Sequence, residues 1–242
     1  MSVSNKNKYR RVLIKLSGEA LGGKSEDIFC HETLDRIVEA IYSLSESGVQ
    51  VALVVGGGNI HRGAPPSSRR GFFDRVAGDH MGMLATVING LALQSKMSER
   101  GMSTEVFSSV QMPLICEEFT QRNALRALEE NRVAIFVGGT AAPFFTTDTA
   151  AVLRSIEMGC DVLMKATQVD GVYSVDPKKD PAAERFDELS YKDILARNLR
   201  IMDLPAISLA QEYKLPILVF SLQGDDCFRK VLQGEERFTL IS

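Results

Sequence analysis

Tryptophan is absent from this chain of 242 residues, histidine occurs three times and cysteine four times. The cysteines are scattered with no paired spacing, and the histidines form no metal-ligand pattern with them. The four cysteines are Cys30, Cys116, Cys160 and Cys227. The sequence therefore predicts a reduced cytoplasmic protein with buried thiols and no metal site of its own.

Long apolar runs are also missing, since none approaches the roughly 20 residues that a membrane span needs. The net charge is −3, from 28 basic and 31 acidic side chains, which argues against a general nucleic-acid-binding surface. Residues 1–8 have no signal-peptide core, so we expect a loose tail. With 45% hydrophobic and 24% charged residues, the chain has the composition of one large α/β domain covering residues 1–242.

The stretch around which the chain is organised is Val51–Asn59, an apolar run that stops at Gly56, Gly57 and Gly58. Such a run predicts a strand buried on both faces of a parallel sheet, whose carboxyl end is where these sheets bind ligands. Glycines let the backbone approach a phosphate closely, and Arg62 can add a forked cation. A plain glycine turn is the alternative, but the triplet followed by Arg62 favours an anion site.

A first strand is expected over residues 11–16, and helical spacing over 32–47 predicts the crossover helix of a βαβ unit. Lys15 lies inside that apolar strand, so its side chain must either extend its charged amine to the solvent or belong to a functional site. The long, almost uniformly apolar helix expected over 79–100 indicates a subunit interface. Asp79 either caps this helix or offers its carboxylate to ribose hydroxyls.

The remaining expected elements alternate between strands and helices. Strands are expected at 104–109, 133–137, 160–165, 216–221 and 238–241, helices at 120–131, 149–158, 191–196 and 205–213, and a hairpin over 166–177 with its turn at Asp170-Gly171.

A second glycine-led loop, residues 138–149, precedes the helix at 149–158, for which Thr147 or Asp148 would be the cap. A helix N-terminus attracts anions, and glycines with threonine hydroxyls add donors. Asp148 cannot itself face a phosphate, so it would orient a lysine or lie near a metal.

Residues 18–25 match the phosphate-loop pattern G-x-x-x-x-G-K-[ST], which would put Lys24 on the phosphates and Ser25 on magnesium. That interpretation needs a further strand ending in aspartate, and none of the expected strands ends that way. Two acidic residues, Glu26 and Asp27, also stand where the anion should bind. We favour a chance match and keep a P-loop NTPase using Lys24 as the alternative.

Five segments together resemble the bacterial uridylate kinases of the amino acid kinase family. They are residues 15–21, 56–59, 78–86, 143–148 and 165–173, in the same order as in that family and spread over nearly the whole chain. The resemblance implies a three-layer αβα sandwich with an open, mainly parallel sheet. It also implies transfer of the ATP γ-phosphoryl group to UMP in pyrimidine nucleotide biosynthesis, Mg²⁺ carried by the ATP phosphates, a homohexamer, and UTP as an inhibitor.

The family positions assign roles to individual residues. The ATP positions are Lys15, Leu16, Ser17, Gly18, Gly58, Arg62, Thr167, Tyr173 and Asp176. The UMP positions are Gly57, Asp79, Thr140, Ala141, Ala142, Pro143, Phe144, Phe145, Thr146 and Thr147. The catalytic positions are Lys15, Arg62, Asp148, Lys165 and Asp203. UMP-binding elements are thus expected mainly in residues 1–160, and ATP-binding elements mainly in 161–242 together with the 15–18 loop.

The chemistry agrees with these roles, because a phosphate acceptor is already anionic and needs no general base. A nucleotide-sensing, non-catalytic member of the same fold is a further alternative. Retention of both Lys15 and Lys165 weighs against it, since a binding protein needs less positive charge at the γ-phosphate.

The chain departs from GTP-activated uridylate kinases at their effector positions. Residues 24–29 lack the Gly-Phe-Gly type segment, and Gln94, Ser98 and Glu105 stand where those kinases have basic residues. Arg132 remains nearby. The resemblance therefore implies an enzyme that GTP activates little.

Overall fold

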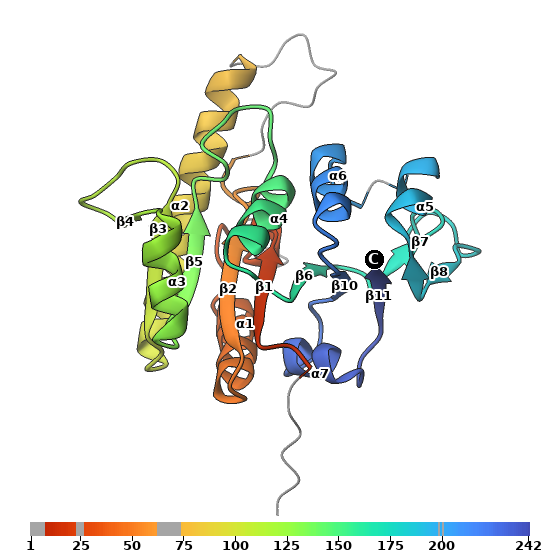
Figure 1. Ribbon diagram of the computed structural model, residues 1–242, viewed down its shortest axis with the longest axis horizontal. Helices are drawn as coiled ribbons and strands as arrows, with labels where there is room; N and C mark the ends of the chain where they lie inside the picture. Colours follow the sequence, from red (N-terminus) through yellow and green to blue (C-terminus); the bar gives the residue numbers. More distant parts are fainter. Residues whose placement is uncertain (1–7, 23–26, 62–73, 198, 200) are drawn as a thin grey trace, which may run out of the picture.

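The structure is a computed structural model that describes residues 8–22, 27–61, 74–197, 199 and 201–242. Its strands are β1 Arg11–Leu16, β2 Gln50–Val55, β3 Thr104–Ser108, β4 Glu117–Glu118, β5 Val133–Val137, β6 Val162–Thr167, β7 Val172–Tyr173, β8 Arg185–Phe186, β9 Glu188–Leu189, β10 Ile217–Ser221 and β11 Phe238–Ile241. Nine of them form one open sheet in the order β4-β3-β5-β2-β1-β6-β10-β11-β9 (Figure 1). Neighbours are parallel except β10 and β11, which confirms the predicted mainly parallel sheet.

Helices cover both faces of this sheet (Figure 1). They are α1 His31–Glu46, α2 Arg75–Glu99, α3 Gln121–Glu129, α4 Thr147–Glu157, α5 Tyr191–Ala196, α6 Leu204–Glu212 and α7 Cys227–Gln233, with a short 3₁₀ helix η1 at Gly18–Ala20. One core packs between the sheet and α1, α2 and α7, and the other between the sheet and α3, α4, α5 and α6. The predicted three-layer αβα sandwich is confirmed.

The pleat of β1 decides where its lysine points. Val12 and Ile14 pack on the side of α1, and Leu13 packs on the side of α4, so Lys15 shares the α4 side with Leu13 because side chains alternate along a strand. In the parallel pairing of β1 with β6, Lys15 lies directly opposite Lys165. Two lysines from segments far apart in sequence therefore meet on one face of the sheet.

Most expected elements lie within a few residues of the observed ones, but the caps expected for helices α2 and α4 were wrong. Helix α2 begins at Arg75, where the Asp74 side chain accepts from the Ala77 amide at 2.9 Å, so Asp79 is inside the helix and does not cap it. Helix α4 is capped by Thr146, whose hydroxyl accepts from the Asp148 amide at 3.1 Å. A cap must precede the first helical turn, and both predictions placed it too late.

The hairpin predicted over residues 166–177 was also wrong. Strand β7 pairs antiparallel with β8, twelve or more residues further along, and these two strands form a separate two-stranded sheet. The Asp170-Gly171 turn therefore redirects the chain without folding it back on β6. Short elements β4, β8, β9 and α7 were not expected at all.

The cysteines are all free, but only Cys227 is buried, and the other three are half-buried. The expectation of uniformly buried thiols was therefore wrong. Burial raises the pKa of the Cys160 thiol to about 12 and that of Cys227 to about 11, which keeps both protonated and unreactive at neutral pH. Within the described part of the chain, no helix is long and apolar enough to cross a membrane.

Gly90 yields a prediction about stability. A Cβ at this position of α2 would overlap Val137 Cγ1 on β5, and a β-branched neighbour in a buried strand has little room to move. We expect Gly90→Ala to lower the free energy of unfolding by about 1–2 kcal/mol, because overpacking outweighs the gain of about 1 kcal/mol in helix propensity. Urea unfolding followed by circular dichroism measures this change.

Gly82 on the same helix is the matched control, because a Cβ there meets nothing within 4 Å. Gly82→Ala should leave stability unchanged or raise it by up to about 1 kcal/mol. Equal effects of the two substitutions would contradict the packing argument.

Candidate active site

A lysine–carboxylate cluster lies at the carboxyl ends of the two central strands β1 and β6. Asp148, in the first turn of α4, contacts Lys15 with one oxygen (Nζ–Oδ1 2.8 Å) and Lys165 with the other (Nζ–Oδ2 2.6 Å). Both lysines are only 9% exposed. One carboxylate therefore fixes the positions of two buried ammonium groups.

The electrostatics of the cluster favour an additional anion. Burial opposes ionisation of Asp148, but the charges of Lys165 and Lys15 outweigh it and hold the pKa of Asp148 below its ordinary value. Burial lowers the pKa of Lys165, with Asp148 opposing this effect and Lys15 adding to it. Asp148 alone does not balance the charges of the two lysines that it contacts, so an additional anion can bind beside them.

Asp203 lies beside this cluster, at the start of α6. Its Oδ2 accepts from the Thr149 hydroxyl at 2.5 Å, and its charge favours the protonated form of Lys165. Its Oδ1 is buried and has no hydrogen-bond partner among the described residues. Asp203 is thus an acceptor that is available near the lysines.

A pocket of about 180 Å³ is formed by the two glycine-led loops and the start of α2. The expected UMP residues that line it are Gly57, Asp79, Thr140, Phe145, Thr146 and Thr147. Residues to which the sequence assigned no individual role also line it, namely His61, Arg75, Gly78, Gly82, Met83, Thr86 and Gly139, together with the expected ATP residue Gly58. Four other expected residues, Ala141, Ala142, Pro143 and Phe144, belong to the same loop but do not line the pocket.

Asp79 is held at the wall of this pocket by two partners. Its carboxylate accepts from Arg75 Nε at 2.7 Å and from the Phe144 amide at 2.7 Å. These bonds tie the second glycine-led loop to α2. A carboxylate held at a pocket wall suits the ribose hydroxyls that the sequence suggested for it.

Buried polar side chains of α2 fasten both glycine-led loops. Asn89, which is fully buried, donates to the Gly56 carbonyl at 2.6 Å and to Asn59 Oδ1 at 2.7 Å. The Thr86 hydroxyl accepts from the Gly138 amide at 2.8 Å. Sequence reasoning missed these residues, although polar side chains at positions i and i+3 of an apolar helix were an available signal.

The glycines of the first loop are needed for close packing. A Cβ at Gly57 would lie 2.8 Å from Ala85 Cβ, and a Cβ at Gly18 would lie 2.5 Å from the Gly58 nitrogen. Real Cβ atoms do not approach so closely. Glycine therefore lets the Gly57 backbone pack directly on α2, and lets the Gly18 backbone pack directly on the Gly56–Gly58 loop.

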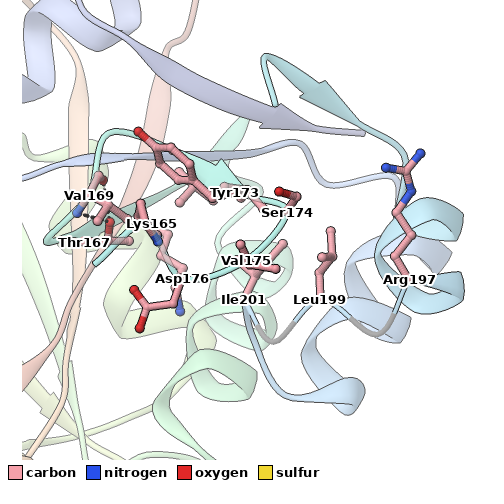
Figure 2. A pocket seen from close by; sticks show the side chains of 14 residues that line it. Lys165, Thr167, Val169, Tyr173, Ser174, Val175, Asp176, Arg197, Leu199 and Ile201 are labelled. Atoms are coloured by element: carbon pink, nitrogen blue, oxygen red, sulfur yellow. Dashed lines mark hydrogen bonds between the residues drawn. The ribbon is translucent and has the colours of Figure 1, made fainter. Parts of the chain in front are cut away.

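A second pocket, of about 510 Å³, extends from Lys165 to the segment that follows β6 (Figure 2). The expected residues Thr167, Tyr173 and Asp176 line it. The residues missed are Val169, Gly171, Val172, Ser174, Val175, Pro177, Arg197, Leu199, Ile201 and Val219. Apolar walls with a few polar groups suit a flat base and its sugar, as is usual for nucleotide sites.

The other expected ATP residues lie near the end of β1 or outside the described part. Leu16 is fully buried in the core, so only its backbone is available to a ligand, and Ser17 precedes η1, which begins at Gly18. Arg62 lies outside the described residues, as do Lys24 and Ser25 of the alternative phosphate loop.

No group of three or more His, Cys, Asp or Glu side chains in the described ranges could hold a metal ion. A magnesium ion that is carried by nucleotide phosphates does not need such a group, because Mg²⁺ keeps several waters and takes one or two protein carboxylates.

Known proteins resemble this chain over nearly its whole length. A sequence profile of the amino acid kinase family matches residues 10–221. Uridylate kinase of Bartonella henselae (strain Houston 1) is 52% identical over 97% of both chains, and that of Agrobacterium fabrum (strain C58) is 51% identical over 99% of this chain and 98% of the other. The crystal structure of UMP kinase from Bacillus anthracis has a TM-score of 0.92 and 37% identity over 97% of this chain and 96% of that one. That from Ureaplasma parvum has a TM-score of 0.91 and 34% identity, over 97% of this chain and 99% of that one.

Asp148 yields a prediction about pH and stability. Asp148→Asn leaves two buried lysines without their counter-charge, so we expect the free energy of unfolding at pH 7 to fall by about 3 kcal/mol. Because the folded pKa of Asp148 is lowered, its stabilisation is complete above the unfolded value of about 3.9 and is lost only as pH falls through the folded value. The difference between wild type and variant should therefore persist from pH 7 to pH 5 in urea unfolding and shrink only in stronger acid.

Asp161 is the matched control, because its carboxylate accepts from the Arg10 and Arg11 amides at the opposite end of β1. Asp161→Asn removes a charge that forms no ion pair with a lysine among the described residues, so it should cost clearly less stability. Equal losses in the two variants would argue against the charge cluster as the cause.

Proposed function

The chain belongs to the amino acid kinase family, and from this membership and the geometry of the site we infer that it is a uridylate kinase. It transfers the γ-phosphoryl group of ATP to UMP and releases UDP and ADP. The observation that carries this conclusion is the cluster of Lys15, Asp148 and Lys165, which concentrates positive charge where two phosphate groups must meet.

The reaction needs little covalent chemistry from the protein. An oxygen of the UMP phosphate forms a bond to the γ-phosphorus of ATP while the bond from that phosphorus to the β–γ bridging oxygen breaks. The attacking oxygen is already anionic, so no side chain has to remove a proton. The enzyme must instead align two anions and offset their repulsion.

We assign the two pockets to the two nucleotides. The pocket between the glycine-led loops would take UMP, with Asp79 at the ribose and the threonines of α4's first turn at the phosphate. The larger pocket would take adenosine, with Tyr173 and Asp176 on its wall. Lys165 lines the larger pocket and contacts Asp148, the neighbour of Thr147, so the cluster lies where the pockets approach each other.

Lys15 and Lys165 would stabilise the charge that develops on the transferred group, and Asp148 would keep both amines oriented and protonated. Arg62 would add a third cation. Magnesium bound to the ATP phosphates would neutralise charge on them, and Asp203, whose Oδ1 has no hydrogen-bond partner among the described residues, would face its hydration shell.

Neither alternative is favoured. The family profile matches residues 10–221, and within that range residues 18–20 form a 3₁₀ turn next to the Gly56–Gly58 loop. Among the described residues the next helix begins only at His31. A nucleotide sensor without turnover would not need both buried lysines.

Three further properties are proposals. A homohexamer is supported by the apolar side chains that α2 exposes, Met81, Leu84 and Ile88. Inhibition by UTP would follow from its uridine occupying the UMP pocket. A cytoplasmic location is supported by the free thiols.

The roles of the two candidate phosphate lysines can be separated by alanine substitution. Lys15→Ala should lower turnover of UMP by about two orders of magnitude or more, because it removes a preorganised charge from the site. Lys24→Ala is the matched control and should leave the chemical step nearly intact. Coupled-enzyme detection of ADP measures both, and reversed effects would sink the uridylate kinase assignment in favour of a P-loop enzyme.

Activation by GTP should be weak in this chain. Arg132, the cation that remains in the expected effector region, is already paired with Glu105 and with Glu130 (Nη2–Oε2 2.8 Å), and Gln94 adds no charge. Charge-assisted contacts worth about 1.5–3 kcal/mol each are thereby missing for a triphosphate. Initial rates at subsaturating ATP should change by less than about twofold when GTP is added, and a several-fold rise would show that the effector site is intact.

A further inference from the structure

The wall of the adenosine pocket is a ribbon that does not belong to the main sheet. Strands β7 and β8 pair only with each other, and β7 with the turn that follows it contributes residues 172–177 to the pocket. A ribbon of two short strands is marginal by itself, so its position must depend on what attaches it to the sheet.

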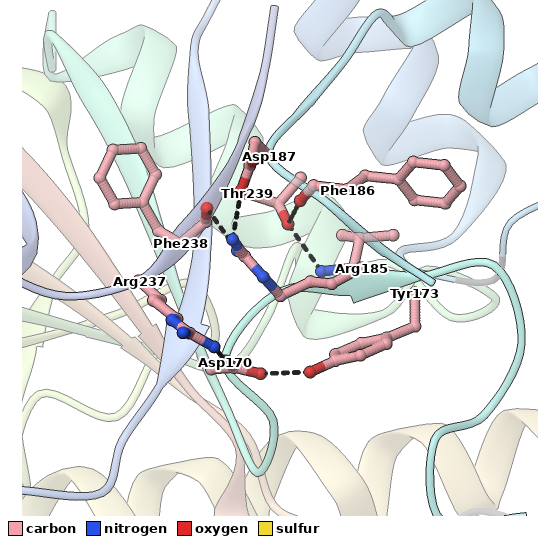
Figure 3. Close-up of polar contacts among 9 residues, drawn as sticks. Asp170, Tyr173, Arg185, Phe186, Asp187, Arg237, Phe238 and Thr239 are labelled. Carbon is pink, nitrogen blue, oxygen red and sulfur yellow. Dashed lines mark hydrogen bonds and ion pairs between the residues drawn. The ribbon is translucent and has the colours of Figure 1, made fainter. Parts of the chain in front are cut away.

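The side chain that makes this attachment is Thr239 on β11, which is fully buried (Figure 3). Its hydroxyl accepts a hydrogen bond from the Val172 amide at 2.8 Å and donates one to the Phe186 carbonyl at 2.5 Å. One oxygen atom thus bonds to the backbones of both β7 and β8. A Cβ at Gly171 would lie 2.6 Å from this oxygen, so the preceding residue must be glycine for the ribbon to come so close.

Two further contacts from the same end of the chain surround this hydroxyl (Figure 3). Arg185 of β8 donates from Nη1 to the Phe238 carbonyl at 3.0 Å. Asp170 accepts from the Tyr173 hydroxyl at 2.5 Å and faces Arg237 (Nη1–Oδ2 3.9 Å). Strand β11 therefore contacts the ribbon through Thr239 and the Phe238 carbonyl, and Arg237 just before β11 faces the turn that leads into β7. Thr239 is the buried one of these contacts.

We propose that Thr239 is a positioning residue for ATP. By bonding to Val172 and Phe186, it fixes the distance between the main sheet and the ribbon that forms the wall of the adenosine pocket. This inference rests on the proposed function. Thr239 does not line the pocket, so it acts without touching the nucleotide. Without its hydroxyl, the Val172 amide and the Phe186 carbonyl lose their buried partner, and the ribbon has to shift to reach other partners or water. The UMP pocket is built from the other half of the sheet and does not depend on this attachment.

The test compares Thr239→Val, which keeps the shape and removes the hydroxyl, with Thr239→Ser, which keeps the hydroxyl. Thr239→Val should raise the KM for ATP about tenfold, equivalent to roughly 1.4 kcal/mol, while kcat and the KM for UMP change less than about twofold. Thr239→Ser should stay within about twofold of wild type for all three constants. A merely structural loss of folded enzyme would lower kcat and would not separate the two KM values.

Ser155→Ala is the matched control, since Ser155 is equally buried and its hydroxyl donates only within α4, to Ala151 O at 2.8 Å. It should leave the KM for ATP unchanged. A folded Thr239→Val enzyme with the wild-type KM for ATP, or with both KM values raised alike, would overturn the proposal. If Thr239→Val does not fold, Arg185→Met weakens the same attachment from β8, and a KM for ATP unchanged in that variant would overturn the proposal instead.

An assay of UMP phosphorylation by the wild-type enzyme distinguishes failure of this inference from failure of the proposed function on which it rests. If wild type does not phosphorylate UMP, the proposed function fails, and calorimetry with a non-hydrolysable ATP analogue then decides the inference alone. The analogue should bind Thr239→Val about tenfold more weakly than wild type, and equal affinities would refute the positioning role.

Discussion

The bridge from Asp148 to Lys15 and Lys165 is the interaction on which the rest of the site depends. Two buried ammonium groups on neighbouring strands repel each other, and burial already lowers the pKa of Lys165. A carboxylate between them offsets this repulsion and favours the charged form of Lys165, which a phosphoryl transfer needs. Asp148 does this for both lysines at once, with one oxygen on each.

The fold supplies this bridge through strand register and one helix. The parallel pairing of β1 with β6 puts the two lysines opposite each other, and α4 begins above them with Asp148 in its first turn. The helix start is held by Thr146, and the adjoining loop is fastened to α2 through Asp79. Buried polar groups are therefore used here to position backbone, which an apolar core alone would not do.

Much of the sheet could be predicted from sequence, because strands such as 133–137 are continuous apolar runs and Lys15 is conspicuous within one. The failures have a common cause, which is that contacts between segments far apart in the sequence are not marked by any local pattern. The Asp170-Gly171 pair is a strong local turn signal, but the partner of β7 is β8, and both strands bond to Thr239 near the end of the chain. In the site, Arg197, Leu199 and Ile201 reach the larger pocket, which we assign to adenosine, from a separate segment, and no local pattern marks them.

The contrast between local sequence signals and contacts between distant segments also applies to the two halves of the site, which are built differently. The side proposed for UMP is formed by loops that leave adjacent parallel strands and are fastened by side chains of one long helix, so its geometry follows from the sheet. The side proposed for adenosine includes a separate ribbon that β11 contacts through Thr239 and Phe238. Because Lys165 belongs to the sheet and Tyr173 to the ribbon, the γ-phosphate and the adenosine of one ATP molecule would contact two different structural units. Accurate alignment of that phosphate with UMP therefore requires the ribbon to be held as firmly as the sheet itself.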